Sequence, residues 1–215
     1  MEFLFKYIAR QFSNPQGFGG KISTFAMNCL NRKLYDAVVE NLDIRETDAI
    51  LDIGFGNGYL MRKLSSENFQ KLYGIEISQD MLHLASKKNR KKIDEGKIRL
   101  LFADVLDLPF EDSSIDKAYT VNTVYFWNDL QKGFSEIKRI LKPGGIFVNA
   151  LYMKEWLDKL PMTRYGFSKF TVEEIEKITR ENDLIIERII EVERSKSVCV
   201  VARKEIINNR KIEIK

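Results

Sequence analysis

Three closely spaced glycines follow a short apolar stretch in the first third of the chain. Residues 50–58 read Ile-Leu-Asp-Ile-Gly-Phe-Gly-Asn-Gly, so Gly54, Gly56 and Gly58 alternate with other residues. Glycine lets the backbone approach a ligand where a Cβ atom would collide with it. A carboxylate, Glu76, follows twenty positions after Gly56. At the end of a neighbouring strand, it can accept hydrogen bonds from both hydroxyls of a ribose, so the pattern predicts a site for an adenosine-containing molecule.

The glycine pattern argues against two other nucleotide sites. A dinucleotide fold favours Gly-x-Gly-x-x-Gly, in which the third glycine allows the helix to pack closely on the strand. Here Tyr59 stands where that third glycine would be. A phosphate-binding P-loop is excluded because no Gly-Lys-Ser or Gly-Lys-Thr follows. A dinucleotide remains the alternative ligand, because the glycine pattern departs from the dinucleotide pattern only at Tyr59.

A second carboxylate, Asp104, directly follows the apolar run at residues 98–103. It can accept a hydrogen bond from the exocyclic amine of adenine, while Val105 and Leu106 supply backbone amides and apolar walls for the ring. Asp107 is the alternative acceptor. Asp104 is favoured because it comes immediately after the predicted strand.

The hydrophobic pattern predicts the elements that must bring these residues together. Strands are expected over residues 49–53, 72–77, 98–103, 115–121, 146–150, 184–192 and 197–203. Helices are expected over residues 2–12, 22–42, 59–65 and 130–141, with two more beginning at Ser78 and at Thr171. Alternating strands and helices predict an α/β fold, a doubly wound and mostly parallel sheet with helices on both faces. The last two strands lack a helix between them, so they are expected to pair as an antiparallel hairpin.

Composition indicates one globular domain without a protein-bound metal. The 215 residues are 44% hydrophobic and 31% charged, and the net charge of +4 is too small to indicate a nucleic-acid partner. Cys29 and Cys199 fit no disulfide or metal-ligand spacing, and His83 is the sole histidine. No apolar run is long enough to span a membrane, and the first ten residues do not resemble a signal peptide. The expected compartment is a reducing cytoplasm.

Four motifs in order then point to a family. They are Asp52-Ile-Gly-Phe-Gly-Asn-Gly58 with Glu76, Asp104, the stretch from Leu108 to Asp116, and Leu141-Lys-Pro-Gly-Gly145. Over about residues 48–203 the chain resembles class I S-adenosylmethionine-dependent methyltransferases, most of all the small-molecule branch that includes the quinone-biosynthesis C-methyltransferases. The resemblance implies a Rossmann-like, seven-stranded sheet of order 3-2-1-4-5-7-6 with strand 7 antiparallel. It also implies transfer of a methyl group from S-adenosyl-L-methionine to a small organic acceptor. The aromatic residues of the stretch 151–169 indicate that this acceptor is apolar or aromatic.

The same resemblance implies which residues bind the cofactor. The backbone of Gly54, Gly56 and Gly58 would surround its methionine part, and Asp52 would orient its ammonium group. Asp52 has an alternative role as a cap of the following turn. The full set of implied contacts is Asp52, Gly54, Gly56, Gly58, Glu76, Ile77, Asp104, Val105 and Asn122.

The remaining contacts concern the nucleoside and the acceptor side. Glu76 would bind the ribose hydroxyls and Ile77 would lie against adenine. Asp104 would accept a hydrogen bond from the adenine amine, with Val105 beside it. Asn122, just after the fourth strand, would contact the methionine end and face the substrate. Its alternative is a turn residue that bonds to its own backbone.

Acceptor contacts are expected from aromatic residues around this core. Tyr125 is the candidate catalytic residue, although the sequence offers no clear general base. Phe126 and Trp127 either line an apolar pocket or pack against the next helix. The predicted substrate-binding residues are Tyr7, Phe18, Tyr125, Trp156 and Tyr165.

These assignments divide the chain into three parts. Residues 1–45 form an N-terminal helical cap or lid, residues 46–205 form the cofactor-binding domain with a substrate-lid insertion near 151–169, and residues 206–215 form a charged tail. The helix over residues 2–12 is expected to pack on the domain, with a lid or a membrane-surface helix as alternatives.

Two other functions stay open at this stage. One is a non-catalytic S-adenosylmethionine-binding module that regulates a partner, and the other is methylation of RNA or protein. The basic run from Lys87 to Lys92 invites a nucleic-acid partner, but a helix end favours cations through its dipole, so a solvated helix end is preferred. Asn122-Thr-Val-Tyr125 lacks the prolines of the amino-group methylase signature. Both a monomer and a homodimer are compatible with the sequence.

Overall fold

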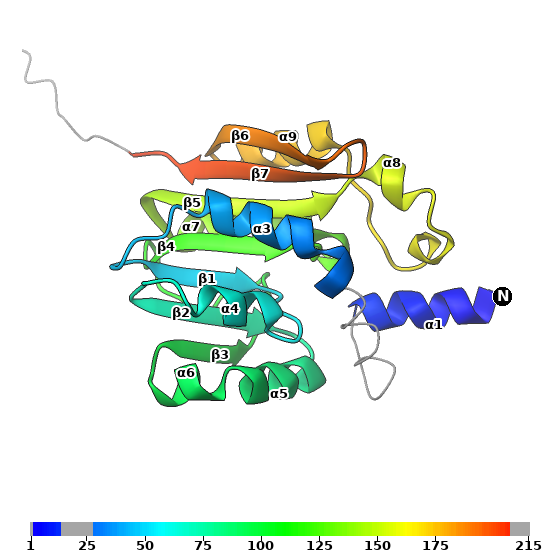
Figure 1. The fold of residues 1–215 in the computed structure, drawn as a ribbon. Helices are drawn as coiled ribbons and strands as arrows, with labels where there is room; N and C mark the ends of the chain where they lie inside the picture. Colours follow the sequence, from blue (N-terminus) through cyan, green and yellow to red (C-terminus); the bar gives the residue numbers. More distant parts are fainter. Residues whose placement is uncertain (1, 14–27, 207–215) are drawn as a thin grey trace, which may run out of the picture.

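The computed structural model describes residues 2–13 and 28–206, and a seven-stranded sheet forms its centre (Figure 1). The strand order is β3-β2-β1-β4-β5-β7-β6, and only the pairs that include β7 are antiparallel. The predicted order and the predicted hairpin are thereby confirmed. The strands are β1 Ala49–Ile53, β2 Lys71–Glu76, β3 Ile98–Phe102, β4 Ile115–Val121, β5 Leu141–Tyr152, β6 Leu184–Glu193 and β7 Ser197–Lys204.

Helices cover both faces of the sheet, as Figure 1 shows. One face carries α3 Arg32–Asn41, α4 Tyr59–Leu64, α5 Gln79–Lys88 and α6 Arg90–Asp94, and the other carries α7 Leu130–Ile140 and α9 Val172–Glu181. The short elements η1 Val124–Phe126, α8 Lys154–Leu157 and η2 Pro161–Arg164 follow β4 and β5, and α1 Glu2–Ser13 lies beyond the edge where the parallel strands end. That edge is where open α/β sheets bind their ligands.

Neighbouring residues of strand β1 pack into two different hydrophobic clusters, one on each face of the sheet. Ile50 packs in the cluster that includes Val38 of α3, whereas Leu51 packs in the cluster that includes Phe134 of α7. Successive side chains of a strand point to opposite faces, and here both faces are buried. Each such fully buried side chain contributes roughly 1.5–3 kcal/mol. The continuous apolar runs noted in the sequence follow from this double burial.

Local caps start the helices directly after the strands. The Ser78 hydroxyl accepts a hydrogen bond from the Met81 amide at the start of α5, two residues after β2 ends. Thr171 and Glu174 form a reciprocal capping box at the start of α9. Both predicted helix starts are confirmed, and they matter for function because the cap of α5 adjoins Glu76.

The start of β5 differs most from the predictions. β5 begins at Leu141 rather than 146, because Leu141 pairs with Ile115 before the register shifts at a bulge. The insertion at 151–169 contains the short helices α8 and η2. Part of the helix expected over 22–42 and nearly all of the charged tail lie outside the described residues. Within residues 2–13 and 28–206, no helix combines the length and apolar character that a membrane crossing requires.

Candidate functional site

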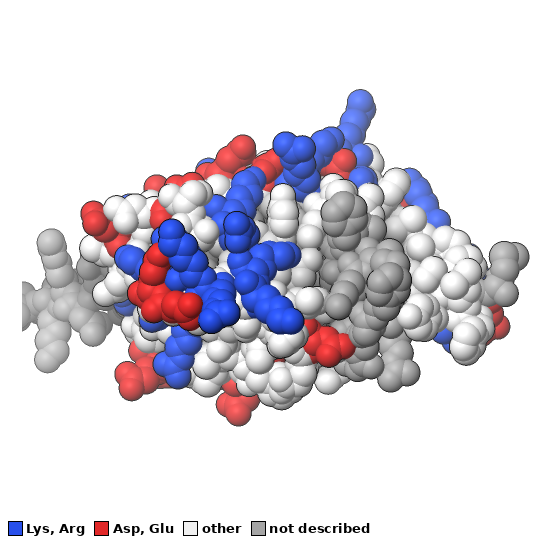
Figure 2. Space-filling model, turned by 60° about the horizontal axis from the view of Figure 1, so that its bottom comes forward, with Lys and Arg blue, Asp and Glu red and all other residues white. Residues whose placement is uncertain are grey.

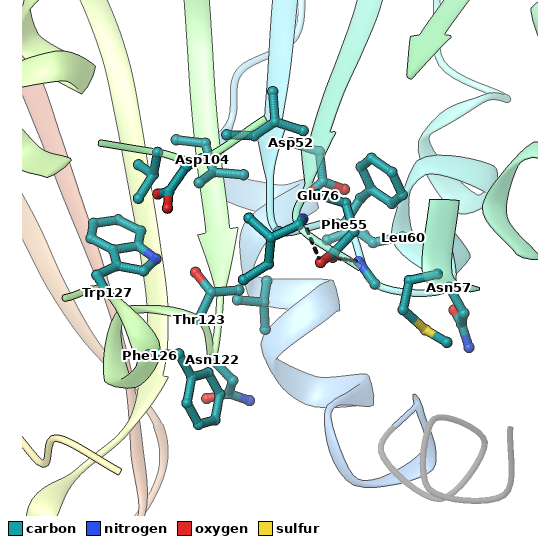
Figure 3. A pocket seen from close by; sticks show the side chains of 18 of the residues that line it. Asp52, Phe55, Asn57, Leu60, Glu76, Asp104, Asn122, Thr123, Phe126 and Trp127 are labelled. Carbon is teal, nitrogen blue, oxygen red and sulfur yellow. Dashed lines mark hydrogen bonds between the residues drawn. The ribbon is translucent and has the colours of Figure 1, made fainter. Parts of the chain in front are cut away.

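A cleft opens at the carboxyl ends of β1, β2, β3 and β4, and Figure 3 shows side chains that line it. We call it the glycine cleft because the turn after β1 forms part of its wall. Asp104 and Trp127 lie on one side, and Asn57 and Leu60 on the other. Eight of the nine predicted cofactor contacts line this cleft: Asp52, Gly54, Gly56, Glu76, Ile77, Asp104, Val105 and Asn122.

Glu76 is held at the end of β2 by backbone amides. Its Oε2 accepts a hydrogen bond of 2.9 Å from the Gly56 amide, and its Oε1 accepts bonds from the amides of Ile77 and Ser78 at 2.9 and 3.0 Å. Burial raises the pKa of Glu76, and these three bonds oppose the rise. A carboxylate offers roughly four acceptor positions, so three protein donors leave capacity for a ligand hydroxyl.

Asp52 lies deeper, on the face of β1 that α3 covers. It is the register partner of Tyr119 in β4, and the Tyr119 hydroxyl donates to Asp52 Oδ2 over 2.8 Å. Burial raises the pKa of Asp52 to about 8, although the bond from Tyr119 lowers it. A buried carboxyl group without a cationic partner favours the neutral form, and a positive ligand group nearby would favour the ionised form.

The three glycines of the turn all adopt left-handed backbone conformations, but for different reasons. A Cβ added at Gly56 would have no atom within 4 Å, so the cleft is open at this point. A Cβ at Gly58 would lie 2.6 Å from Asn89 Nδ2 and 2.7 Å from Ala85 Cβ of α5. Gly58 is not among the residues that line the cleft. The structure therefore places Gly58 at the contact of α4 with α5, and its contact with the cofactor stays a prediction.

Asp104 follows β3 and begins the turn that leads away from it. Its Oδ1 accepts a hydrogen bond of 3.0 Å from the Leu106 amide, and the residue is exposed to solvent. Asp104 lines the cleft and Asp107 does not, which agrees with the preference drawn from the sequence.

A second, mostly apolar cavity of about 230 Å³ lies beside the glycine cleft. We call it the apolar cavity. Its walls come from η1, from the end of β5 and from the insertion 151–169, and they include Tyr125, Phe126, Tyr152, Trp156, Leu157, Leu160, Met162 and Phe167. The cleft and the cavity share three lining residues, Asn31, Asn122 and Phe126. The two spaces therefore meet at the end of β4.

Asn122 organises this junction. Its φ of +58° is in the left-handed region, which asparagine tolerates better than most residues. Its Nδ2 donates to Asn31 Oδ1 over 3.0 Å, and its Oδ1 accepts from the Tyr152 amide over 3.1 Å. Asn31 was missed in the sequence because a single asparagine before a helix carries no signal of a partner 91 positions away.

The predicted acceptor contacts divide into two groups. Tyr125 and Trp156 line the apolar cavity. Tyr7 and Tyr165 line neither space, because Tyr7 lies on α1 with 46% of its surface exposed and the Tyr165 ring packs 5.5 Å from the ammonium of Lys6. A substrate contact of these two tyrosines stays a prediction, and Phe18 lies outside the described residues.

Tyr125 is poorly suited to accept a proton. Its hydroxyl lies 2.9 Å from both Asn122 Oδ1 and the Tyr152 carbonyl oxygen, and burial raises its pKa well above 10. The phenol is thus protonated at neutral pH and can donate but not act as a general base. Of the described residues that line the apolar cavity, none is a carboxylate or a histidine, and His83 is exposed on α5. No cluster of metal-binding side chains occurs in residues 2–13 and 28–206.

Figure 2 shows the face formed by β3, α5 and α6, where Lys and Arg side chains gather beside acidic ones. The basic run 87–92 spans the end of α5 and the start of α6. Arg90 lies 3.6 Å from Asp94, and Lys92 lies 3.0 Å from Glu95. The positions agree with the preferred interpretation of a solvated helix end.

A family model described as a methyltransferase domain matches residues 51–149. The chain is 32% identical over 184 residues to an uncharacterised methyltransferase, YdaC, of Bacillus subtilis, covering 85% of this chain and 98% of the relative. It is 30% identical to 24-methylenesterol C-methyltransferase 2 of Oryza sativa, over 53% of this chain and 31% of that enzyme.

Among solved structures, geranyl diphosphate C-methyltransferase from Streptomyces coelicolor superposes with a TM-score of 0.71 at 16% identity. The match covers 90% of this chain and 87% of that enzyme. The structure of that enzyme was solved in complex with Mg²⁺, geranyl diphosphate and S-adenosyl-L-homocysteine. At this identity the likeness concerns the fold alone.

Proposed function

Because the chain belongs to the class I S-adenosylmethionine-dependent methyltransferases, we propose that it transfers a methyl group from S-adenosyl-L-methionine to a small apolar acceptor. The observation that carries this proposal is the junction of the glycine cleft with the apolar cavity at Asn31, Asn122 and Phe126. A group transfer needs two ligands side by side, and these two spaces share a wall at the edge of the sheet where open α/β folds perform chemistry.

The residues of the glycine cleft fit the cofactor. Glu76 presents a fixed carboxylate with remaining acceptor capacity for ribose hydroxyls. Asp52 is a buried carboxyl group that a positively charged ligand would stabilise in its ionised form. Gly56 leaves open space where any side chain would enter the cleft. Asp104 is the proposed partner of the adenine amine, with Ile77 and Val105 beside the ring.

When bound, S-adenosyl-L-methionine would supply an activated methyl group on a cationic sulfur, ready for attack by a nucleophile from the side opposite the sulfur. The protein's task is orientation, which can contribute up to about 10 kcal/mol. Asn122 is proposed to set the boundary between the two spaces, since it bonds both to Asn31 and to the Tyr152 backbone. Tyr125 is proposed to position Asn122 through its hydroxyl and not to move a proton.

The apolar cavity supports an acceptor that needs no deprotonation by the protein. Its described lining provides aromatic and aliphatic surface and no carboxylate or histidine. A general base is required only where the nucleophile must lose a proton. The acceptor is therefore proposed to carry a group that is already an anion, whose charge the transferred methyl group neutralises without loss of a proton.

One named relative supports an apolar acceptor, since 24-methylenesterol C-methyltransferase 2 is a C-methyltransferase of a sterol. None of the relatives described above is named as a quinone-biosynthesis enzyme, so that narrower resemblance stays a prediction, as does the cytoplasmic location.

Calorimetry with S-adenosyl-L-methionine and S-adenosyl-L-homocysteine tests the first ligand. The Glu76→Gln variant should bind both at least about tenfold more weakly, because it exchanges a charged acceptor for a neutral one. Glu95→Gln, at an exposed ion pair with Lys92, is the matched control and should bind normally. If the unmodified protein binds neither compound at millimolar concentration, the proposed function is wrong.

A methyl-release assay then tests the acceptor class. Purified protein is incubated with labelled cofactor and separate panels of apolar metabolites, RNA and peptides. Turnover is expected with the apolar metabolites. Turnover only with RNA, with strong dependence on salt, would favour the nucleic-acid alternative, and binding without turnover on any panel would favour a regulatory module.

A further inference from the structure

We propose that the methyl acceptor is an anionic amphiphile, and that Lys196 receives its negative group at the wall of the apolar cavity. The inference rests on the proposed function, since it assigns this cavity to the acceptor. It goes further because it names the charge of the acceptor and the residue that recognises it.

The size of the cavity sets the size of the apolar part. A closed apolar cavity of about 150 Å³ is enough to bind benzene. The apolar cavity here has about 230 Å³. In proportion, it holds roughly nine non-hydrogen atoms, which corresponds to a medium-length chain or a substituted ring.

Most polar side chains of this cavity are already engaged within the protein. Asn31 and Asn122 bond to each other, and the Tyr125 hydroxyl bonds to Asn122 and the Tyr152 backbone. The Tyr152 hydroxyl donates to the Leu30 carbonyl over 3.1 Å. Among the described residues that line the cavity, Lys196 alone is charged. It is therefore the group best able to choose a ligand by charge.

The backbone around Lys196 is fixed by the turn between β6 and β7. The Lys196 amide donates to the Glu193 carbonyl over 2.9 Å, and the Lys196 carbonyl accepts from the Met153 amide over 2.9 Å. The ammonium lies 5.4 Å from the ring centre of Tyr152 and 5.0 Å from that of Trp156. Both rings line the apolar cavity, so the ammonium is held against its aromatic wall.

The local charge balance at this wall is positive. Glu193 accepts from Lys196 at 2.8 Å and from Lys33 at 3.3 Å, so one carboxylate serves two ammonium groups. An anionic ligand group would complete this cluster. A cationic group would meet a carboxylate that two lysines already occupy, and a neutral group would gain nothing from the surplus charge.

Three nine-carbon probes test the charge preference: nonanoate, nonan-1-ol and nonylamine. Calorimetry at neutral pH is performed with the full chain, with and without saturating S-adenosyl-L-homocysteine. Nonanoate should bind about tenfold more tightly than nonan-1-ol, and nonylamine should bind most weakly. Equal or tighter binding of the alcohol or the amine, or binding of none of the three at millimolar concentration, overturns the proposal.

Two variants assign the preference to Lys196. Lys196→Met keeps the apolar stem and removes the charge. It should therefore weaken the binding of nonanoate about tenfold and change the binding of nonan-1-ol by less than about twofold. Lys159→Met is the matched control, because Lys159 also packs on Trp156 but does not line the cavity. It should change nonanoate binding by less than about twofold. An equal loss in both variants would contradict a specific role of Lys196.

Glu193→Gln provides the opposite test. Removing the carboxylate that competes for Lys196 should tighten the binding of nonanoate. If the cavity instead took a cation at Glu193, the same substitution would weaken the binding of nonylamine. A weakened nonanoate in this variant counts against the proposal. The outcome is separable from the proposed function, which fails if S-adenosyl-L-homocysteine does not bind, whatever the order of the three probes.

Discussion

The hydroxyl of Tyr119 donates a hydrogen bond to Asp52 Oδ2 over 2.8 Å, from a position directly opposite Asp52 in the neighbouring strand. Both side chains are buried, and burial raises the pKa of Asp52 to about 8 despite this bond. A carboxyl group at the wall of the glycine cleft is thus protonated in most molecules at neutral pH. Two predictions follow from its titration.

The first concerns stability. The pKa of Asp52 is about 8 in the folded protein against 3.8 ordinarily, so the folded state binds the proton more tightly. The stabilisation of the folded state that protonated Asp52 provides is fully present below about pH 4 and is lost as the pH rises towards about 8. We expect the free energy of unfolding of the unmodified protein, relative to Asp52→Asn, to fall by at least about 1 kcal/mol between about pH 5 and pH 8. Urea unfolding at several pH values measures it, with exposed Asp107→Asn as control; parallel curves for the unmodified protein and Asp52→Asn would contradict it.

The second concerns ligand binding. If Asp52 orients the cofactor's ammonium group, binding ionises it, so up to one proton is released at about pH 7. The apparent heat of binding should then differ between phosphate and Tris buffers, whose ionisation enthalpies differ. The difference should disappear in Asp52→Asn. Identical heats in both buffers for the unmodified protein would show that Asp52 does not ionise on binding.

A matched pair of substitutions separates ligand contact from helix packing in the glycine turn. Gly56→Ala and Gly58→Ala both place alanine in the left-handed region, at φ of +54° and +69°. Gly56→Ala should lower the free energy of unfolding by only about 1–2 kcal/mol but reduce cofactor affinity, because its Cβ enters the cleft. Gly58→Ala should cost at least about 1 kcal/mol more, since its Cβ would meet Ala85 and Asn89. Equal stability of the two variants would contradict this division.

Asn122 allows its backbone and its side chain to be tested separately. Asn122→Gly loses the side-chain hydrogen bonds but adopts the left-handed backbone conformation easily. Asn122→Ala loses the same bonds and is also strained in that conformation. Alanine should therefore be less stable than glycine here by about 1 kcal/mol in denaturant unfolding. Both variants should be impaired in methyl transfer. An alanine variant as stable as the glycine variant would show that the backbone is not strained at this position.

Glu136 gives a pH dependence of the opposite sign. It accepts bonds from Arg139 at 2.8 and 3.0 Å and from the Leu108 amide at 2.9 Å, and its pKa falls to about 2, mainly through Arg139. Its contribution is present above about pH 4.5 and is lost as the pH falls towards about 2. Glu136→Gln should lose roughly 2 kcal/mol at neutral pH and show a shallower acid transition by circular dichroism. An unchanged acid midpoint would contradict this assignment.

Much of the fold is local in origin, which is why the sequence predicts it. The strand ends at Ile53 and Val121 were placed correctly, because apolar runs stop where turn residues begin. Ser78 and Thr171 cap their helices through bonds to residues three positions away, so their signals lie within one turn of chain. The order of the strands came from the family resemblance and not from these local patterns.

The sequence by itself determined the elements, the glycine turn and the carboxylates Asp52, Glu76 and Asp104 at the ends of the strands, because these depend on neighbours along the chain. Only the tertiary structure decided that Asn31 meets Asn122, that Gly58 packs against α5, and that Lys196 reaches the wall beside Trp156. The physical reason is that each of these contacts joins segments that are distant in sequence. Their geometry is set by strand register and helix packing, which no local pattern of residues encodes.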